Sequence, residues 1–168
     1  MNSLEPFPDW NSILDSYQNE TDRAAAILAS SYLESYLGEC IKSFLVDHKS
    51  IEKIFEGYSA LATFSARTDM AFALGLITEE LKHNLYYIRK IRNHFAHHPK
   101  VTSFADSHVR NLCSNFSLLI KIEDGTTIDI AEDEVEPRKK FLLVVGLSMA
   151  DLYLLALNYE KRTIPIKF

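Results

Sequence analysis

The segment 78–99 constrains the fold more than any other part of the chain. Its apolar residues recur at spacings of three and four, the period of one face of an α-helix. This stripe consists of Leu81, Leu85, Ile88, Ile91 and Phe95. Thr78 is a favourable N-cap, and Glu79 and Glu80 would follow it in the first turn, where the helix dipole favours acids. Because Pro99 disfavours helical geometry at the residue before it, the pattern predicts a helix that ends near His97.

Other segments also show helical patterns, and five glycines and five prolines in 168 residues favour long regular elements. Asn19 or Thr21 is expected to cap the first long helix. The expected helices cover residues 22–46, 50–55, 64–76, 104–115 and 137–161, with a short helix near 10–17. Two β-branched runs flank Asp124-Gly125 within 118–130, which predicts a β-hairpin. The expected fold is all-α: a bundle of four to five main helices with one small β-hairpin insertion.

Two of these helices have faces that bear on how the bundle packs. In 22–46, a stripe with small residues is expected to let another helix approach closely, and it consists of Ala24, Leu28, Ser31 and Ser35. In 64–76, four apolar residues are predicted to face inward, namely Ala66, Met70, Ala73 and Leu74.

The composition limits the classes of partner and compartment. A net charge of -5 argues against a protein that binds duplex DNA through its whole surface, which would be basic. Cys40 and Cys113 lack C-x-x-C spacing and fit reduced thiols in a cytoplasmic protein, with a single bridge as the alternative. The opening MNSLEPFPDW lacks the pattern of a signal peptide. We expect one soluble domain over 1–168.

The apolar segment 141–159 is long enough to span a bilayer. However, Asp151 lies in its middle, where a charge is costly in a membrane. A helix in the core or at a dimer interface is therefore favoured over a membrane span.

The end of helix 78–97 concentrates polar chemistry. On a helical wheel Arg92 falls at the edge of the buried stripe, so it needs an acidic partner or a phosphate. The candidate acids are Glu34, Asp69 and Glu39. Asn93 and His97 share the opposite side, and His97 lies about 140° around the helix from Arg92. The two side chains meet only if the last turn unwinds or if two copies of the helix face each other in a dimer.

Arginine and histidine are the residue types that metal-independent RNA cleavage uses. An imidazole transfers protons near neutral pH, and a guanidinium holds the charged phosphate oxygens. Nearby basic and imidazole groups are candidates for RNA binding: Arg89, Lys90, His94, His98 and Lys100. Arg67 and Asp69 are expected to make structural or partner contacts. The histidine spacing does not favour a metal site, and no cofactor is predicted.

The pattern Arg92-Asn93-x-x-x-His97 resembles the R-[polar]-x-x-x-H signature of the HEPN superfamily, whose helical domains include toxin and antiviral ribonucleases. The resemblance implies a symmetric homodimer, with Arg92 and His97 as the catalytic pair and Asn93 supporting them. It also implies an RNA substrate and an antitoxin as partner. Some HEPN toxins carry a modified tyrosine shortly after the histidine, whereas here His98-Pro99-Lys100 follow.

A second resemblance covers roughly residues 20–118. The residues Phe64-Ser65-Ala66-Arg67, Ala71 and Leu74-Gly75-Leu76-Ile77, followed by I-R-x-x-R-N-x-F-A-H, are similar to the mannitol operon repressor (MltR)-like family. Such domains are helical regulators compatible with a HEPN-like bundle. Two functions stay open: a dimeric, metal-independent endoribonuclease, and a non-enzymatic transcriptional regulator that acts through protein–protein contacts.

Overall fold

The computed structural model describes residues 17, 19–121, 127–129 and 135–157. The helices in these ranges are α2 (Asp22–Phe44), α3 (Ser50–Phe55), α4 (Phe64–Ala73), α5 (Glu79–His97), α6 (Ser107–Cys113) and α7 (Pro137–Leu157). The strands are β1 (Leu119–Lys121) and β2 (Thr127–Asp129). The predicted all-α bundle with a small β-hairpin is confirmed.

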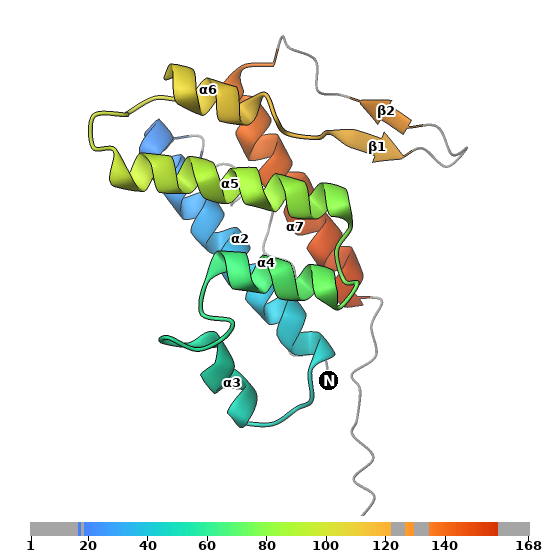
Figure 1. Cartoon of the computed structure of the whole chain (residues 1–168). Coiled ribbons are helices and arrows are strands. Elements are labelled where there is room, and N and C mark those ends of the chain that lie inside the picture. The colour runs from blue at the N-terminus through green and yellow to red at the C-terminus, as the bar shows by residue number, and fades with distance from the viewer. Residues whose placement is uncertain (1–16, 18, 122–126, 130–134, 158–168) are drawn as a thin grey trace, which may run out of the picture.

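The bundle is built around α2, α5 and α7, which contact one another (Figure 1). Helix α4 packs against α2 and α5, and α6 packs against α5 and α7. The largest fully buried side chains come from α4, α5, α7 and the loop before α6, and they are Phe64, Phe95, Phe104 and Phe141. Burial of these aromatic rings supplies a large share of the apolar driving force for folding.

Helix α5 follows the prediction in its bounds, cap and buried face. The Thr78 hydroxyl accepts a hydrogen bond from the backbone N–H of Leu81 at 3.1 Å. The five residues of the predicted stripe are the buried residues of this helix. Of the two predicted caps for α2, Thr21 is the one that accepts, from the N–H of Ala24 at 3.3 Å.

The other elements differ from the predictions mainly at their ends. Helix α2 stops at Phe44, where Leu45 is extended, and α6 begins only after the Asp106 cap. β1 and β2 pair antiparallel with Ile120 opposite Ile128, which confirms the hairpin. The expected Asp124-Gly125 turn, the helix near 10–16 and the extension of α7 past residue 157 lie outside the described residues.

Helix α4 ends at Ala73 because the chain makes a glycine turn there. Gly75 has a φ of 68°, in the left-handed region that favours glycine. The N–H of Leu76 donates to the carbonyl of Ala71 at 2.9 Å, and the N–H of Gly75 donates to the carbonyl of Phe72. This pattern is typical of a glycine helix cap.

The predicted inward face of α4 is wrong for three of its four residues. Phe64, Thr68 and Ala71 are its buried residues. Met70 and Leu74 are 37% and 46% exposed, Ala73 is exposed and Ala66 is only half-buried. The physical reason is that α4 has apolar residues on more than one side, and the bulky Phe64 ring occupies the core.

The stripe with small residues on α2 lies on the outside of the bundle. Leu28 is 48% exposed, and Ser31 and Ser35 are exposed as well. The close approach of another helix to this stripe therefore stays a prediction. Cys40 and Cys113 are buried free thiols, and burial raises the pKa of each to about 12. Within the described ranges, no helix combines the length and apolar character needed to cross a membrane.

Candidate functional site

Arg92 reaches from α5 to α2, where one Nη atom lies 3.4 Å from an Oε atom of Glu34. The side chains are 25% and 19% exposed, so the pair lies at the edge of the core. The prediction that Arg92 needs an acid is confirmed, and Glu34 is that acid. The other two candidates pair elsewhere: Asp69 with Lys82 and Glu39 with Lys42.

The Arg92–Glu34 pair is loose for an arginine at the edge of a core. Its one contact is at the long end of hydrogen-bonding distance. The Nε atom of Arg92 is buried and has no hydrogen-bond partner. An unused buried donor costs stability, so this guanidinium is held less firmly than a bidentate one would be.

His97 does not meet Arg92 within one chain. Helix α5 stays helical through His97, and the N–H of His98 still donates to the carbonyl of His94 at 3.0 Å. The unwound last turn is therefore wrong as a route to a composite site. His97 is exposed and Asn93 is half-buried. A dimer stays the one route by which Arg92 and His97 could act together.

Two other imidazoles, those of His98 and His108, gather instead around His94. The ring of His98 stacks on the His94 ring with centroids 4.2 Å apart. The ring of His108, from α6, has its centroid 4.4 Å from that of His94. Asp106, the cap of α6, has an Oδ atom 3.8 Å from Nε2 of His94. That Nε2 atom is buried without a hydrogen-bond partner. Sequence spacing indicated His94 with His98, but it gave no sign that His108 joins them.

The His94 cluster consists of His94, His98, His108 and Asp106. Its surroundings disfavour a positive charge on the His94 ring. Burial of the ring, followed by the neighbouring His98 and His108 imidazoles, lowers the pKa of His94, and the Asp106 carboxylate only partly opposes this. This lowered pKa disfavours the charged form of the His94 ring, which weakens its contact with Asp106 as an ion pair. In the part of the chain that the structure describes, no group of three ligating side chains is arranged to hold a metal ion.

This cluster predicts a loss of stability in acid. Because the folded pKa of His94 lies below its unfolded value, the unfolded chain binds more protons, and the contribution of His94 to stability falls as the pH drops below about 6.5. We expect urea unfolding between pH 5 and 8 to show a steeper loss of stability for the wild type than for His94→Gln. Parallel curves for the two proteins would contradict the expectation.

The basic residues expected to bind RNA differ in their contacts and exposure. The Nζ of Lys90 lies 4.6 Å from the centroid of the Tyr86 ring, and the guanidinium carbon of Arg89 lies 5.6 Å from it. Lys100 is exposed beyond the end of α5. Lys90 and Arg89 therefore make cation–π contacts around an exposed tyrosine. Their role in RNA binding stays a prediction.

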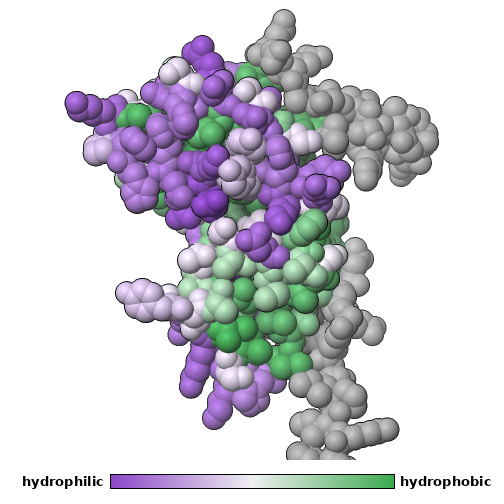
Figure 2. Space-filling model, viewed as in Figure 1, coloured by the Kyte–Doolittle hydropathy of each residue, from purple (hydrophilic) through white to green (hydrophobic). Residues whose placement is uncertain are grey.

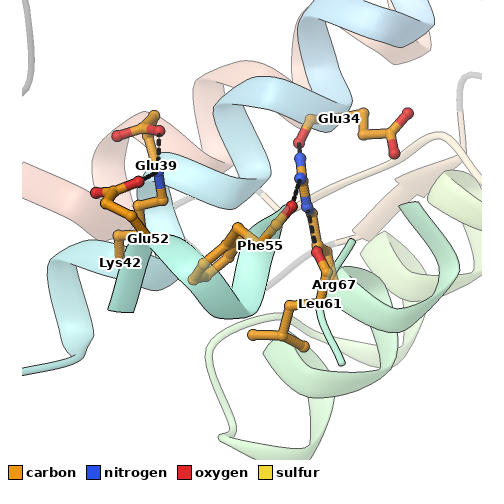
Figure 3. Close-up of polar contacts among 7 residues, drawn as sticks. All are labelled: Glu34, Glu39, Lys42, Glu52, Phe55, Leu61 and Arg67. Atoms are coloured by element: carbon orange, nitrogen blue, oxygen red, sulfur yellow. Dashed lines mark hydrogen bonds and ion pairs between the residues drawn. The ribbon is translucent and has the colours of Figure 1, made fainter. Parts of the chain in front are cut away.

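Arg67 joins three segments of the backbone (Figure 3). Its Nε donates to the carbonyl of Leu61 at 2.9 Å, and its Nη atoms donate to the carbonyls of Glu34 at 3.0 Å and Phe55 at 3.2 Å. The guanidinium also lies 5.6 Å from the centroid of the Phe55 ring. These contacts give Arg67 a structural role, which was one of the two expected.

An apolar surface at the end of α4 was missed by the sequence reasoning. We call Met70, Phe72, Ala73 and Leu74 the α4 surface, and each of them is exposed. Figure 2 shows apolar residues gathered over α4, beside the hydrophilic surface of α5. The available signal was that 64–76 has more apolar residues than one buried helix face needs.

Comparisons with known proteins show the fold alone. No protein-family model matches the chain, and no curated protein matches it. Among solved structures, a chain of the X-ray structure of the MtlR–HPr complex from Escherichia coli is similar, with a TM-score of 0.57 and 14% sequence identity. The match covers 84% of this chain and 96% of that one. The chain therefore has an MltR-like fold, as the second resemblance predicted.

Proposed function

We propose that this chain is a non-enzymatic regulator that acts by binding another protein through the α4 surface. The observation that carries the proposal is the exposure of large apolar side chains at one helix end: Met70 at 37%, Phe72 at 39% and Leu74 at 46%. Clustered exposed apolar residues are typical of protein-binding surfaces. Methionine and phenylalanine are among the residue types enriched at interfaces.

The α4 surface also has a polar border. The Nζ of Lys82 lies 4.3 Å from the centroid of the Phe72 ring and 3.4 Å from an Oδ atom of Asp69. An apolar centre with a charged border is the usual anatomy of a specific interface. The contact with Lys82 also restrains the Phe72 ring, which lowers the entropy cost of binding.

The fold likeness supports the same proposal. The similar Escherichia coli chain comes from a complex between MtlR and HPr, so a bundle of this shape is found in a protein–protein complex. HPr is therefore the first purified partner to test.

We expect a photoreactive phenylalanine analogue at position 72 to cross-link to a discrete second protein in cells. The matched control carries the analogue at Tyr86, an aromatic of similar exposure (41%) outside the α4 surface. A combined Met70→Glu and Leu74→Glu change should abolish the adduct, because charges in an apolar interface weaken binding by about tenfold or more. Both positions are exposed, so stability should change by only about 0.5 kcal/mol per substitution.

Mass spectrometry of the adduct identifies the partner, and calorimetry with purified HPr tests that candidate directly. Adducts of equal yield at positions 72 and 86, or adducts only between copies of this chain, would argue against a heterologous partner at the α4 surface.

Ribonuclease activity is the second candidate. It is supported by the loose Arg92–Glu34 pair, whose Nε donor is unused, and by the exposed His97. This candidate also requires a dimer that brings Arg92 of one copy close to His97 of the other. RNA incubated with EDTA separates the two functions. A regulator leaves the RNA intact, whereas cleavage that is lost in folded Arg92→Ala and His97→Ala proteins would establish the ribonuclease.

A further inference from the structure

A pocket of about 430 Å³ opens between the start of α5, the residues just before β1 and the middle of α7. This volume lies in the range of small-molecule sites. Its lining consists of Thr78, Glu80, Leu81, Asn84, Ser117, Leu118, Val144, Leu147, Ser148 and Asp151. None of these residues belongs to the α4 surface, to the Arg92–Glu34 pair or to the His94 cluster.

Two of the polar groups in the lining are already used by the fold. The Asn84 side chain donates to the carbonyl of Ser117 at 2.8 Å and accepts from its N–H at 2.9 Å. The Thr78 hydroxyl accepts from the N–H of Leu81. These bonds hold the α5 and β1 walls of the pocket in place. They also leave the Asp151 carboxylate as the strongest group able to meet a ligand.

Asp151 lies exposed at the open side of the pocket. Within the described residues it has neither an ion pair nor a hydrogen bond, and partial burial raises the pKa of its carboxyl. Glu80 brings a second carboxylate from the first turn of α5, where the helix dipole favours the charged form. The charged groups of the lining are therefore both acidic.

The remaining walls are apolar. Leu81 and Leu118 are buried, as is Val144, while Leu147 is 37% exposed at the mouth. An apolar cavity with carboxylates at its edge complements a ligand with an apolar body and a positive charge.

We propose that this pocket binds a small organic cation, an amine whose ammonium group faces Asp151 and whose apolar body lies against Leu81, Leu118 and Val144. Such a ligand gives Asp151 a counter-charge, which no residue in the described part of the chain supplies. An anion would be repelled by the Asp151 carboxylate, and a neutral ligand would bring that carboxylate no counter-charge.

Benzylammonium is a suitable probe, with benzyl alcohol and benzoate as matched neutral and anionic controls. We expect saturable amide shifts in an NMR titration, centred on Thr78, Ser117 and Leu118, for benzylammonium alone. Asp151→Asn should weaken binding at least tenfold, because it removes the charge, and it breaks no ion pair with a described residue. Glu52→Gln removes a carboxylate that pairs with Lys42 outside the pocket, and it should bind as the wild type does.

A second variant guards against an indirect effect of Asp151→Asn. Leu147→Trp places a larger ring at the mouth, at a position exposed enough to accept it, and should prevent binding while the amide spectrum stays folded. The proposal is overturned if benzyl alcohol binds as tightly as benzylammonium, if Asp151→Asn keeps the wild-type affinity, or if no probe gives saturable shifts. None of these results depends on the α4 surface, so they test the pocket independently of the proposed function.

Discussion

Replacing Arg67 with alanine is expected to destabilise the fold by about 3–4 kcal/mol. The substitution removes the donors for three backbone carbonyls, those of Glu34, Phe55 and Leu61. Hydrogen bonds from a charged donor contribute about 1.5–3 kcal/mol each, and the estimate is reduced because the side chain is only partly buried. Urea unfolding measures the change. Arg67→Lys should also destabilise the protein, since an ammonium group lacks the planar fork that reaches three acceptors.

Gly38 provides an independent test of how firmly Arg67 is held. A Cβ atom at Gly38, in the middle of α2, would lie 3.1 Å from an Nη atom of Arg67. Alanine in a helix is otherwise about 1 kcal/mol more stable than glycine. Gly38→Ala should therefore give no gain in the wild type and should stabilise the Arg67→Ala protein. Equal effects in both backgrounds, or a loss below about 1 kcal/mol for Arg67→Ala, would contradict this account.

The sequence was most informative where a helix is apolar on one side only. Helix α5 has a single buried stripe between polar faces, so its bounds and its core residues followed from periodicity. Helix α4 has apolar residues on several sides, so periodicity alone did not show that Phe64 would enter the core and that Met70 would face outward. The choice depends on the shape of α2 and α5 beneath it, which local sequence does not contain.

The candidate site was predictable in its residue types but not in its contacts. Burial of the stripe on α5 placed Arg92 at the core edge and required an acid, yet three acids met that requirement. Only the crossing of α2 by α5 selects Glu34. His108 joins His94 because the chain turns back between α5 and α6, and spacing along a single helix could not show such a contact.

Phe95→Ala is expected to cost about 3–5 kcal/mol, the usual range for removing a phenylalanine from a core. Phe95 is fully buried, and its ring lies edge-on to Phe104 with centroids 5.1 Å apart. Phe104 in turn contacts Phe141 of α7, so the cavity would open where α5, the loop before α6 and α7 meet. Thermal or urea unfolding measures the loss, and Phe95→Leu should recover a large part of it because leucine refills most of the space.

Phe72→Ala is the matched control, because Phe72 is 39% exposed on the α4 surface and should change stability by less than about 1 kcal/mol. A similar loss for both variants would show that Phe95 is not the core residue described. The comparison also helps to distinguish a loss of stability from the loss of a reactive side chain in variants of residues 92–97. Phe95 lies between Arg92 and His97, so a loss of activity in a Phe95 variant would reflect its lower stability rather than a missing reactive group. Arg92→Ala and His97→Ala test the chemistry only in proteins whose unfolding curves show that this core is intact.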